Sequence, residues 1–363
     1  MEYNPFHYGH KYHIDQAKSI TDCDILIAIM SPNVVQRGEF AVIDKKRRVL
    51  AALQQGVDVV FELPSIFVLQ NADIFATGAI KLLAQSGITD LVFGSESADL
   101  AYLNQLAELN FDIDKIKEEL RGGDSYPQVL GRLSDKLYPN DILALAYLKA
   151  LKNYPTVTPH LLKRTNSYLA TTLDSEFASA TAIRAQLHNQ SIDLSVYTPL
   201  ADDLRRYSND PSAYYNLIRY QLLVSQRAVL SSYLLVDEGI ENHLVKVAQN
   251  CEDYATFLQQ ALTKRYTASR IRRTLMNILL QVKKSDKETL ETTSKLRLLG
   301  FNRHGRRFLK QLKAQEVPYV SQFRDLAVAQ RELELRCSQL YQLYYPDKTI
   351  VASEVQGPSF YDG

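Results

Sequence analysis

The sequence has few cysteines, and none of its apolar runs is long. Its three cysteines are far apart: Cys23, Cys251 and Cys337. This sparse, odd count argues against a disulfide framework or a structural zinc site and is typical of reduced thiols in a cytosolic protein. No apolar run approaches the ~20 residues of a membrane helix, and residues 1–5 lack the basic and apolar regions of a secretory signal. We therefore expect a cytoplasmic protein without a membrane segment.

Neither disorder nor a single small domain fits the composition. The chain has 363 residues, of which 46% are hydrophobic and 23% charged. This balance is that of a globular protein, and the length favours two or three domains. The sequence contains no G-x-S-x-G nucleophile motif, and it shows no internal repeat.

The charge is balanced overall but unevenly distributed. There are 42 basic and 41 acidic residues in the whole chain. Residues 264–313 contain 15 basic and 3 acidic residues, a net charge of +12, so the remainder carries −11. A basic block on an otherwise acidic protein is the expected footprint of a polyanionic partner. The alternative is a solvated helical surface.

The first hundred residues alternate between buried-strand and helical patterns. Strands are predicted at 24–30, 57–63 and 90–94, and helices at 10–19, 43–54 and 72–86. Gly56 and Gly87 stand where helix C-terminal caps belong. This alternation predicts parallel βαβ units. Ligands bind at the carboxyl ends of such strands, so the loops after Tyr3, Met30, Leu63 and Phe93 are the expected functional loops.

The remaining patterns are mostly helical. A helix is predicted at 134–151, a strand at 156–162 and a helix that begins at Ser179. From Ala201 onward we expect nearly all helix, including a late amphipathic helix at 332–343. We predict three segments: residues 1–195 form an α/β domain, residues 196–345 a helical domain, and residues 346–363 a tail.

Two constellations carry the chemistry. His7 and His10 flank Gly9 at a predicted strand-to-helix turn, where free backbone N–H groups favour anions. The imidazoles can donate hydrogen bonds to a phosphoryl group as charge develops on it. His13 follows on the same helical face. A metal site in this trio is disfavoured, because no cysteine or carboxylate is spaced to complete it. The alternative is a set of polar surface histidines.

The second constellation is residues 178–184, Ala-Ser-Ala-Thr-Ala-Ile-Arg. Ser179 is a good N-cap, and the hydroxyls, the free amides and Arg184 form a second phosphate grip. An upstream H-x-G-H followed by this segment is the two-part signature of nucleotidylyltransferases.

The sequence resembles the tRNA(Met) cytidine acetate ligase family along most of its length. The similarity lies in these segments: 2–10, 31–39, 61–64, 93–96, 139–143, 178–184, 263–267, 270–273 and 299–302. The resemblance implies a Rossmann-like H-x-G-H nucleotidylyltransferase domain with a parallel sheet, followed by a mostly α-helical C-terminal domain. It also implies an ATP-dependent ligase. That enzyme would activate acetate as acetyl-AMP and acetylate N4 of the wobble cytidine of elongator tRNA(Met).

The resemblance also implies site residues. His7, His10 and Arg184 would be catalytic. ATP would be bound by Glu2, Tyr3, Asn4, Pro5, Phe6, His7, Tyr8, Gly9, His10, His13, Gly94, Asn140, Arg164, Ser179 and Thr181. Mg²⁺ is expected with ATP, with no dedicated protein metal site. Gly94 could instead be a turn glycine, Asn140 a helix cap and Arg164 a surface cation.

The basic block supplies the predicted tRNA contacts. They are Lys264, Arg265, Arg270, Arg272, Arg273, Arg303, Arg306 and Arg307. Tyr266, Phe301 and Phe308 could stack on unpaired bases, although core packing is the more ordinary role for each. Gln36, Arg37 and Glu39 either line the acetate or cytidine pocket or brace their loop. The sequence indicates no protein partner.

The sequence departs from the family pattern in three places. Almost no strand pattern precedes Asn4, Tyr8 replaces a usual Asn, and residues 165–171 lack the usual Gly-rich stretch. Two rival functions stay open. The first is a small-molecule adenylyltransferase of the same superfamily, which needs no basic block. The second is a non-catalytic RNA-binding protein.

Overall fold

The computed structural model describes residues 1–108, 138–164, 173, 177–187, 189–207 and 210–363. Strands and helices alternate in its first half. In chain order these elements are α1 (Tyr8–Thr21), β1 (Ile27–Met30), β2 (Val34–Val35), β3 (Glu39–Phe40), α2 (Lys45–Gln54), β4 (Val59–Glu62), α3 (Ser65–Val68), α4 (Ala72–Ala84), β5 (Asp90–Ser95), α5 (Leu100–Glu108), α8 (Pro139–Leu151), β6 (Thr158–Lys163) and α9 (Ala180–Ala185).

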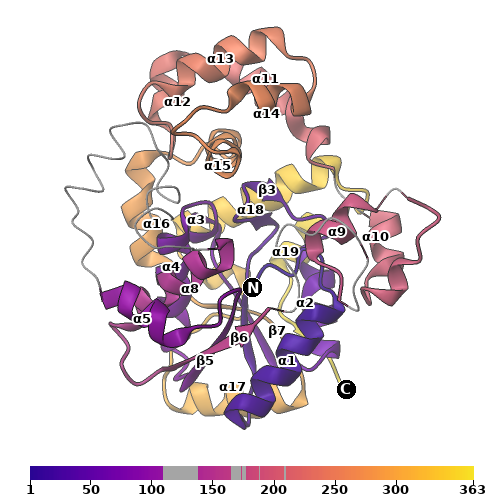
Figure 1. The fold of residues 1–363 in the computed structure, drawn as a ribbon, viewed down its shortest axis with the longest axis vertical. Coiled ribbons are helices and arrows are strands. Elements are labelled where there is room, and N and C mark those ends of the chain that lie inside the picture. Colours follow the sequence, from indigo (N-terminus) through magenta and orange to yellow (C-terminus); the bar gives the residue numbers. More distant parts are fainter. Residues whose placement is uncertain (109–137, 165–172, 174–176, 188, 208–209) are drawn as a thin grey trace.

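The second half is mainly helical (Figure 1). Its helices are α10 (Ala201–Tyr207), α11 (Tyr215–Val224), α12 (Arg227–Ser232), α13 (Ile240–Asn250), α14 (Tyr254–Ala261), α15 (Ala268–Leu279), α16 (Lys287–Thr293), α17 (Arg303–Ala314), α18 (Val328–Tyr344) and α19 (Ile350–Val355). Its strands are β7 (Arg297–Phe301) and β8 (Ser359–Phe360). Short 3-10 helices lie at Leu194–Val196 (η1), Pro211–Tyr214 (η2), Lys284–Asp286 (η3) and Phe323–Asp325 (η4).

The predicted pattern of parallel βαβ units is confirmed. β1 pairs with β4 in parallel, and β5 pairs with β6 in parallel. Asn71 and Asp44 cap α4 and α2 by accepting hydrogen bonds from backbone amides three residues on. Gly56 and Gly87, which follow α2 and α4, have φ values of +106° and +71°. Glycine adopts this left-handed conformation at low cost, as a helix stop requires.

The expectation of nearly all helix after Ala201 is confirmed, but it missed two strands. β7 pairs antiparallel with β4, and β8 adds to β7 in parallel, so the main sheet has the order β1-β4-β7-β8. β7 lies in the second predicted segment and β8 in the predicted tail, yet both complete a sheet that begins in the first. Non-local pairing of this kind is not visible in local periodicity. The three-part division of the chain stays a prediction.

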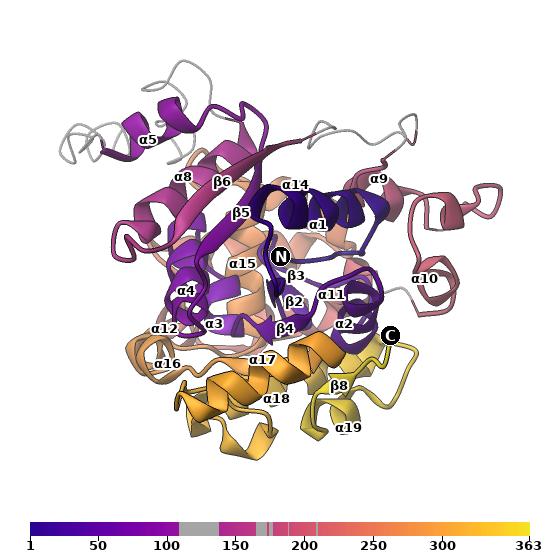
Figure 2. The same cartoon turned by 90° about the horizontal axis from the view of Figure 1, so that it is seen from below.

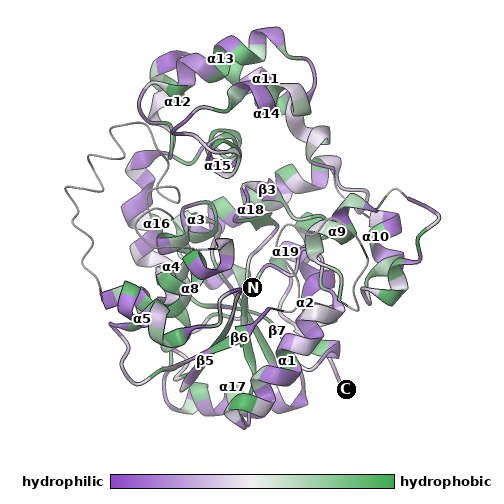
Figure 3. Cartoon of the chain, in the orientation of Figure 1, coloured by the Kyte–Doolittle hydropathy of each residue, from purple (hydrophilic) through white to green (hydrophobic). Residues whose placement is uncertain are grey.

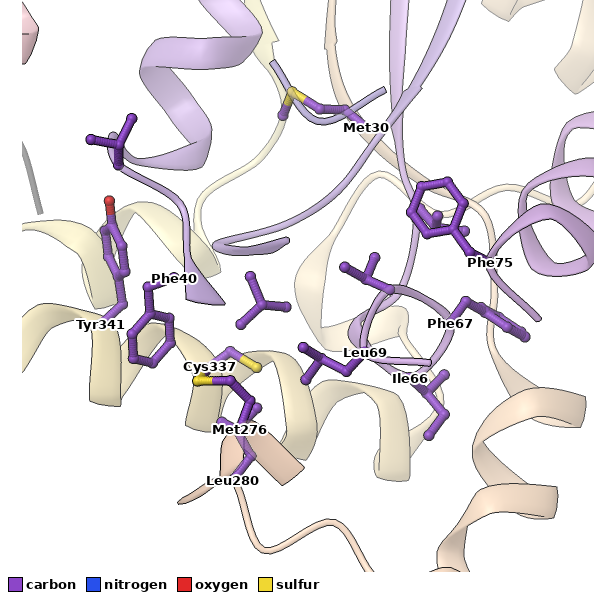
Figure 4. Packing of buried hydrophobic residues seen from close by; sticks show 14 of the residues in the cluster. Met30, Phe40, Ile66, Phe67, Leu69, Phe75, Met276, Leu280, Cys337 and Tyr341 are labelled. Carbon is purple, nitrogen blue, oxygen red and sulfur yellow. The ribbon is translucent and has the colours of Figure 1, made fainter. Parts of the chain in front are cut away.

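One hydrophobic core cluster runs through both halves of the chain. Figure 4 shows buried residues of both halves in this cluster, among them Phe67 and Leu69 after β4, Met276 of α15 and Cys337 of α18. Figure 3 shows hydrophobic colour along the central strands and hydrophilic colour on outward helix faces. None of the helices described is long and apolar enough to cross a membrane.

The edges of β1 and β5 face each other across a cavity. Neither strand pairs with the other, and residues 25–29 and 90–94 both line a cavity of about 800 Å³. Ile14 of α1 and Phe308 of α17 also line it. These helices lie on opposite sides of the sheet when the molecule is seen from below (Figure 2). Met1 borders the cavity, where its amino group donates to the carbonyl of Ile29.

A buried ionic network ties the C-terminal elements to the sheet. Glu354 of α19 accepts hydrogen bonds from Lys45, Arg297 and Ser338. Glu62 of β4 pairs with the same two cations. Burial alone would raise the pKa of Glu354, but Lys45 and Arg297 lower it to about 2. The carboxylate is therefore charged and fully engaged.

We predict that Glu354→Gln destabilises the fold strongly. Lys45 and Arg297 would keep their buried positive charges but lose one of the two carboxylates that neutralise them. The expected cost is about 3–5 kcal/mol in the free energy of unfolding. Urea denaturation measures this loss. Glu332→Gln on exposed α18 surface is the matched control and should change stability by less than about 0.5 kcal/mol. A loss below about 1 kcal/mol in Glu354→Gln would contradict the assigned role of the network.

Candidate active site

The loop that precedes α1 is held from several sides. The side-chain oxygen of Asn4 accepts a hydrogen bond from the backbone N–H of Val42 at 2.7 Å, and Arg184 donates to the Asn4 carbonyl. Thr198 donates to the carbonyl of Phe6 at 2.6 Å. The loop backbone is therefore fixed by the β3–α2 connection, by α9 and by residues that follow η1.

Arg48 of α2 adds a second set of restraints. It is completely buried and donates to backbone carbonyls of Glu2, Ser31, Pro32 and Ile43. These four acceptors are neutral backbone groups, so the guanidinium serves as a multiple hydrogen-bond donor that joins two loops. Sequence reasoning missed Arg48, because a basic residue in an amphipathic helix is expected to face solvent.

His7, His10 and His13 lie together at the beginning of α1. The ring centroids of His7 and His10 are 3.7 Å apart, and the backbone N–H of His7 donates to Nδ1 of His10 at 3.2 Å. Burial, together with Arg164 and Arg184, lowers the pKa of His7 to about 3. Burial, together with the N-terminus and Arg164, lowers that of His13 to about 4. The pKa of His10 is also far below its usual value, through burial and then His7.

These imidazoles are therefore neutral at pH 7. Nδ1 of His7 is buried and has no hydrogen-bond partner among the residues that the structure describes. A buried polar atom without a partner normally costs free energy. A ligand with phosphate oxygens would supply a partner, and its negative charge would raise the pKa values of the histidines. The cluster is thus suited to an anion that gains charge.

The carboxyl ends of β5 and β6 supply further predicted residues. Gly94 lies against the Arg164 side chain, since a Cβ atom at Gly94 would be 3.4 Å from its Cγ. Asn140, in the first turn of α8, donates to Glu96 through its side chain and its backbone N–H. Asp141 is completely buried and accepts from the Ser95 hydroxyl and from the backbone N–H of Glu96. The 93–96 and 139–143 motifs therefore form one unit.

The roles of Glu96 and Asp141 could not be assigned from the sequence. Both residues belong to motifs that the sequence singled out, but only the structure shows that Asp141 fixes the loop after β5 and that Glu96 holds Asn140. The segment 165–171, where the sequence departs from the family pattern, lies outside the described residues.

α9 carries the second constellation to the same place. Ser179 caps the helix by accepting a hydrogen bond from the backbone N–H of Ala182 at 3.0 Å, as predicted. Arg184 donates to the Thr181 hydroxyl at 3.2 Å and to the Asn4 carbonyl. The two motifs, far apart in the sequence, are thus joined by a direct hydrogen bond.

Most of the predicted ATP-binding residues line the one cavity described above. They are Glu2, Tyr3, Asn4, His7, Gly9, His10, His13, Gly94, Asn140, Arg164, Ser179, Thr181 and Arg184. Pro5, Phe6 and Tyr8 do not line it. Phe6 packs against Tyr3 and His10 instead, and the Tyr8 backbone N–H donates to the carbonyl of Tyr197. The loop after Leu63 is also absent from the cavity wall, because Ser65 is bound by Glu334 of α18.

The described residues contain no group of three or more His, Cys, Asp or Glu side chains that could hold a metal ion. A divalent cation at this site would need ligands from a bound molecule as well as from the protein.

The predicted tRNA-binding residues do not form a single patch. α15 and α17 lie on opposite sides of the central strands (Figure 1). Near α15, Lys264 is exposed and Arg270 covers the Tyr266 ring at 3.8 Å from its centroid. On α17, Arg303 pairs with Asp362, and Arg306 and Arg307 are exposed. The basic window of the sequence therefore splits into two cationic groups.

Several residues of this basic window make contacts within the protein. Arg272 pairs with Glu39 at 3.1 Å, and Arg273 is half-buried and donates to the carbonyl of Gln36 at 3.1 Å. Tyr266 is 2% exposed and donates to the carbonyl of Asp237, so it is not available for base stacking. Gln36 and Arg37 line the cavity, and Glu39 braces the loop through Arg272; a role of these residues in binding acetate or cytidine stays a prediction.

Comparisons with known proteins agree with this geometry. Residues 1–355 match the model of a family described as HIGH Nucleotidyl Transferase. A tRNA(Met) cytidine acetate ligase of Oceanobacillus iheyensis is 34% identical, over 99% of this chain and 98% of that protein. One of Bacillus subtilis is also 34% identical, over 94% and 91%.

Two solved structures share the fold. A crystal structure of Thermotoga maritima TmcAL in its apo form has a TM-score of 0.89 and 29% identity, and covers 100% of this chain and 98% of that one. A second structure of TmcAL, bound with alpha-thio ATP, has a TM-score of 0.85 and 28% identity, with the same coverage.

We predict that stability falls as the pH is lowered through the range from 6.5 to about 4. The unfolded chain binds protons at His7, His10 and His13 near pH 6.5, whereas the folded chain does not, so unfolding gains protons in this range. Each such group lowers the free energy of unfolding by up to about 1.4 kcal/mol per pH unit. Thermal unfolding at pH 7, 6 and 5 measures the slope, and His13→Gln should reduce it. An equal slope in this variant would contradict burial of a neutral His13.

Proposed function

We propose that this chain, which belongs to the family of tRNA(Met) cytidine acetate ligases, activates acetate with ATP and acetylates N4 of the wobble cytidine of elongator tRNA(Met). One observation carries the proposal. The two phosphate-binding motifs, His7 with His10 and Ser179 with Arg184, line one cavity and are hydrogen-bonded to each other through Asn4. That cavity contains cations and neutral donors, which is what transfer of an AMP group requires.

In the first step, a carboxylate oxygen of acetate attacks the α-phosphorus of ATP. A bond forms between that oxygen and phosphorus, and the bond from phosphorus to the leaving diphosphate breaks. The neutral imidazoles of His7 and His10 donate hydrogen bonds to the phosphoryl oxygens as their charge grows. Arg184, Ser179 and Thr181 hold the diphosphate. No strong base is needed, because the attacking oxygen is already ionised.

In the second step, the N4 amine of cytidine attacks the acetyl carbonyl carbon. The new bond is the amide, the bond to AMP breaks, and N4 loses one proton to water. Cytosine N4 is a weak nucleophile, which is why the acetyl group must first be activated. Glu96 and Asn140 fix the loop beside Gly94, where we expect the nucleoside part of ATP to bind.

Mg²⁺ fits this site only as a companion of ATP. The described residues provide no three-ligand cluster, so the phosphates would supply most of the ligands. Bound in this way, the ion would neutralise phosphate charge. We expect the enzyme to act in the cytoplasm, where its tRNA substrate is found.

Acetate-dependent exchange of diphosphate into ATP tests the first step. We predict exchange by the wild-type protein and a loss of about 10²-fold or more in His10→Ala, because one donor to the transition state is removed. His304→Ala, an exposed histidine on α17 (69% side-chain exposure), is the control and should exchange normally. Near-normal exchange in His10→Ala would exclude that role. Wild-type exchange with ATP that does not depend on acetate would favour another adenylyltransferase.

We also propose that both cationic groups contact tRNA. When the logarithm of the binding constant is plotted against the logarithm of the salt concentration, each Lys or Arg that neutralises a phosphate makes the slope steeper by about one unit. Lys264→Ala with Arg270→Ala, and separately Arg306→Ala with Arg307→Ala, should therefore weaken tRNA binding and reduce its log–log salt slope by about two. Fluorescence titration at several salt concentrations measures the slope.

The control removes the same charge outside both groups. It combines Arg324→Ala with Lys348→Ala, two exposed positions outside residues 264–313. This variant should keep the wild-type slope. A slope unchanged in both test variants would show that the basic residues are a solvated surface.

A further inference from the structure

The hairpin of β2 and β3 connects the N-terminal loop with helix α15. In Figure 1, β3 lies between α15 and the N-terminus of the chain. Residues 36–38 form the hairpin tip, next to the paired residues Val35 and Glu39. Gln36 at this tip lines the cavity that contains the histidine cluster. One part of the cavity wall therefore belongs to a segment that contacts the helical half of the chain.

The backbone of Gln36 is held on both sides. Its N–H donates to the Glu2 carboxylate at 2.6 Å, and its carbonyl accepts from Nη1 of Arg273 at 3.1 Å. Gly38 has a φ of +80°, and a Cβ atom there would be 2.2 Å from the Arg273 backbone nitrogen, so the tip rests on the backbone of α15. A side chain that orients a substrate needs a fixed backbone of this kind.

The Gln36 side chain keeps its hydrogen-bonding groups for a bound molecule. Among the residues that the structure describes, none is hydrogen-bonded to this carboxamide. Two other carboxamides in the cavity wall are engaged: the Asn4 oxygen accepts from the backbone N–H of Val42, and the Asn140 nitrogen donates to Glu96. Gln36 thus offers one acceptor oxygen and two N–H donors to the cavity.

A neutral carboxamide is suited to a nucleobase more than to acetate or diphosphate. Anions are bound best by charged donors, whereas the carboxamide of Gln pairs with a base edge that has one donor and one acceptor. Cytosine has such an edge, in which the N4–H donor lies beside the N3 acceptor. Adenine has one as well, but we expect the adenosine of ATP beside Gly94, at the ends of β5 and β6, and Gln36 belongs to the hairpin after β1.

We propose that Gln36 binds and orients the acceptor cytosine in the second step, with Oε1 accepting from N4–H and Nε2 donating to N3. This inference rests on the proposed function, because it concerns the base that receives the acetyl group. In that step N4 bonds to the acetyl carbon, and the bond from this carbon to AMP breaks. The N4 proton held by Gln36 stays in the product amide, and the other N4 proton passes to water.

The position of the hairpin agrees with a base that comes from bound tRNA. The first turn of α15 carries Arg270, one of the proposed tRNA contacts, and the same helix holds the Gln36 carbonyl through Arg273. A tRNA held at α15 therefore approaches the cavity from the side of Gln36. The helix contributes to the second step by fixing the residue that meets the base.

The first experiment measures the two steps separately. Acetate-dependent diphosphate exchange reports the first step, and single-turnover acetyl transfer from preformed acetyl-AMP to tRNA reports the second. Gln36→Ala should exchange diphosphate like the wild type but transfer acetyl about ten- to hundredfold more slowly, because N4 loses the group that orients it. Gln105→Ala, on the exposed surface of α5, is the matched control and should behave as wild type in both assays. A loss of exchange in Gln36→Ala would overturn the inference, because it would place Gln36 in the first step.

The second experiment changes the base instead of the protein. A tRNA with 3-deazacytidine at the wobble position keeps the N4 amine but has C–H in place of N3. The ratio of transfer rates for normal and 3-deaza tRNA should be about tenfold larger in the wild type than in Gln36→Ala, since any change in the reactivity of the amine cancels in this comparison. Gln36→Glu has the same shape but no N–H donor, so its ratio should also be small. Equal ratios in the three proteins would overturn the pairing with N3.

The outcomes separate this inference from the proposed function. Normal acetyl transfer by Gln36→Ala, with normal thermal midpoints for all variants, would overturn the inference and leave the proposed function standing. An absence of acetyl transfer by the wild-type protein would contradict the proposed function itself. Transfer that depends on both Gln36 and N3 would support both.

Discussion

The site depends on the fixed backbone of residues 1–7. This segment has no regular structure of its own before α1, and it takes its conformation from donors on other elements. Arg48 holds the carbonyl of Glu2, Arg184 that of Asn4, and Thr198 that of Phe6. These donors come from α2, from α9 and from the residues after η1. The histidines are therefore oriented by tertiary contacts that must form before the site exists.

The electrostatics follow from this placement. The loop and the first turns of α1 bring three imidazoles into a region that also contains Arg164 and Arg184, and burial beside these cations keeps the rings neutral. Neutral imidazoles beside arginine side chains are suited to polyphosphate. The same arrangement costs stability at low pH, because protonation of the rings is favoured only after unfolding.

Local patterns predicted the elements of the first half closely. The strands expected at 57–63 and 90–94 are found at 59–62 and 90–95, and the helix expected at 72–86 is found at 72–84. In this part of the chain short apolar runs alternate with segments of helical periodicity, and this pattern fits few other assignments of secondary structure. The placement of β7 beside β4 was missed, since a pairing between residues more than two hundred positions apart leaves no local signal.

The chemistry of the site was predictable where residue types form compact motifs, as at His7 to His10 and Ser179 to Arg184. It was not predictable where one residue type can serve two purposes. A count of charges treats Arg270 and Arg273 alike, yet Arg270 stacks on the Tyr266 ring while Arg273 donates to the backbone carbonyl of Gln36. Only the tertiary structure distinguishes the environments of these two cations.

The acetylated product is the most direct test of the proposed function. Purified protein is incubated with ATP, labelled acetate and elongator tRNA(Met), and the nucleosides and nucleotides are then separated. We predict labelled N4-acetylcytidine in the tRNA, with one AMP formed for each acetyl group transferred. Diphosphate release without labelled nucleoside would show that the activated acetyl group is passed to a different acceptor, and would contradict the proposed function.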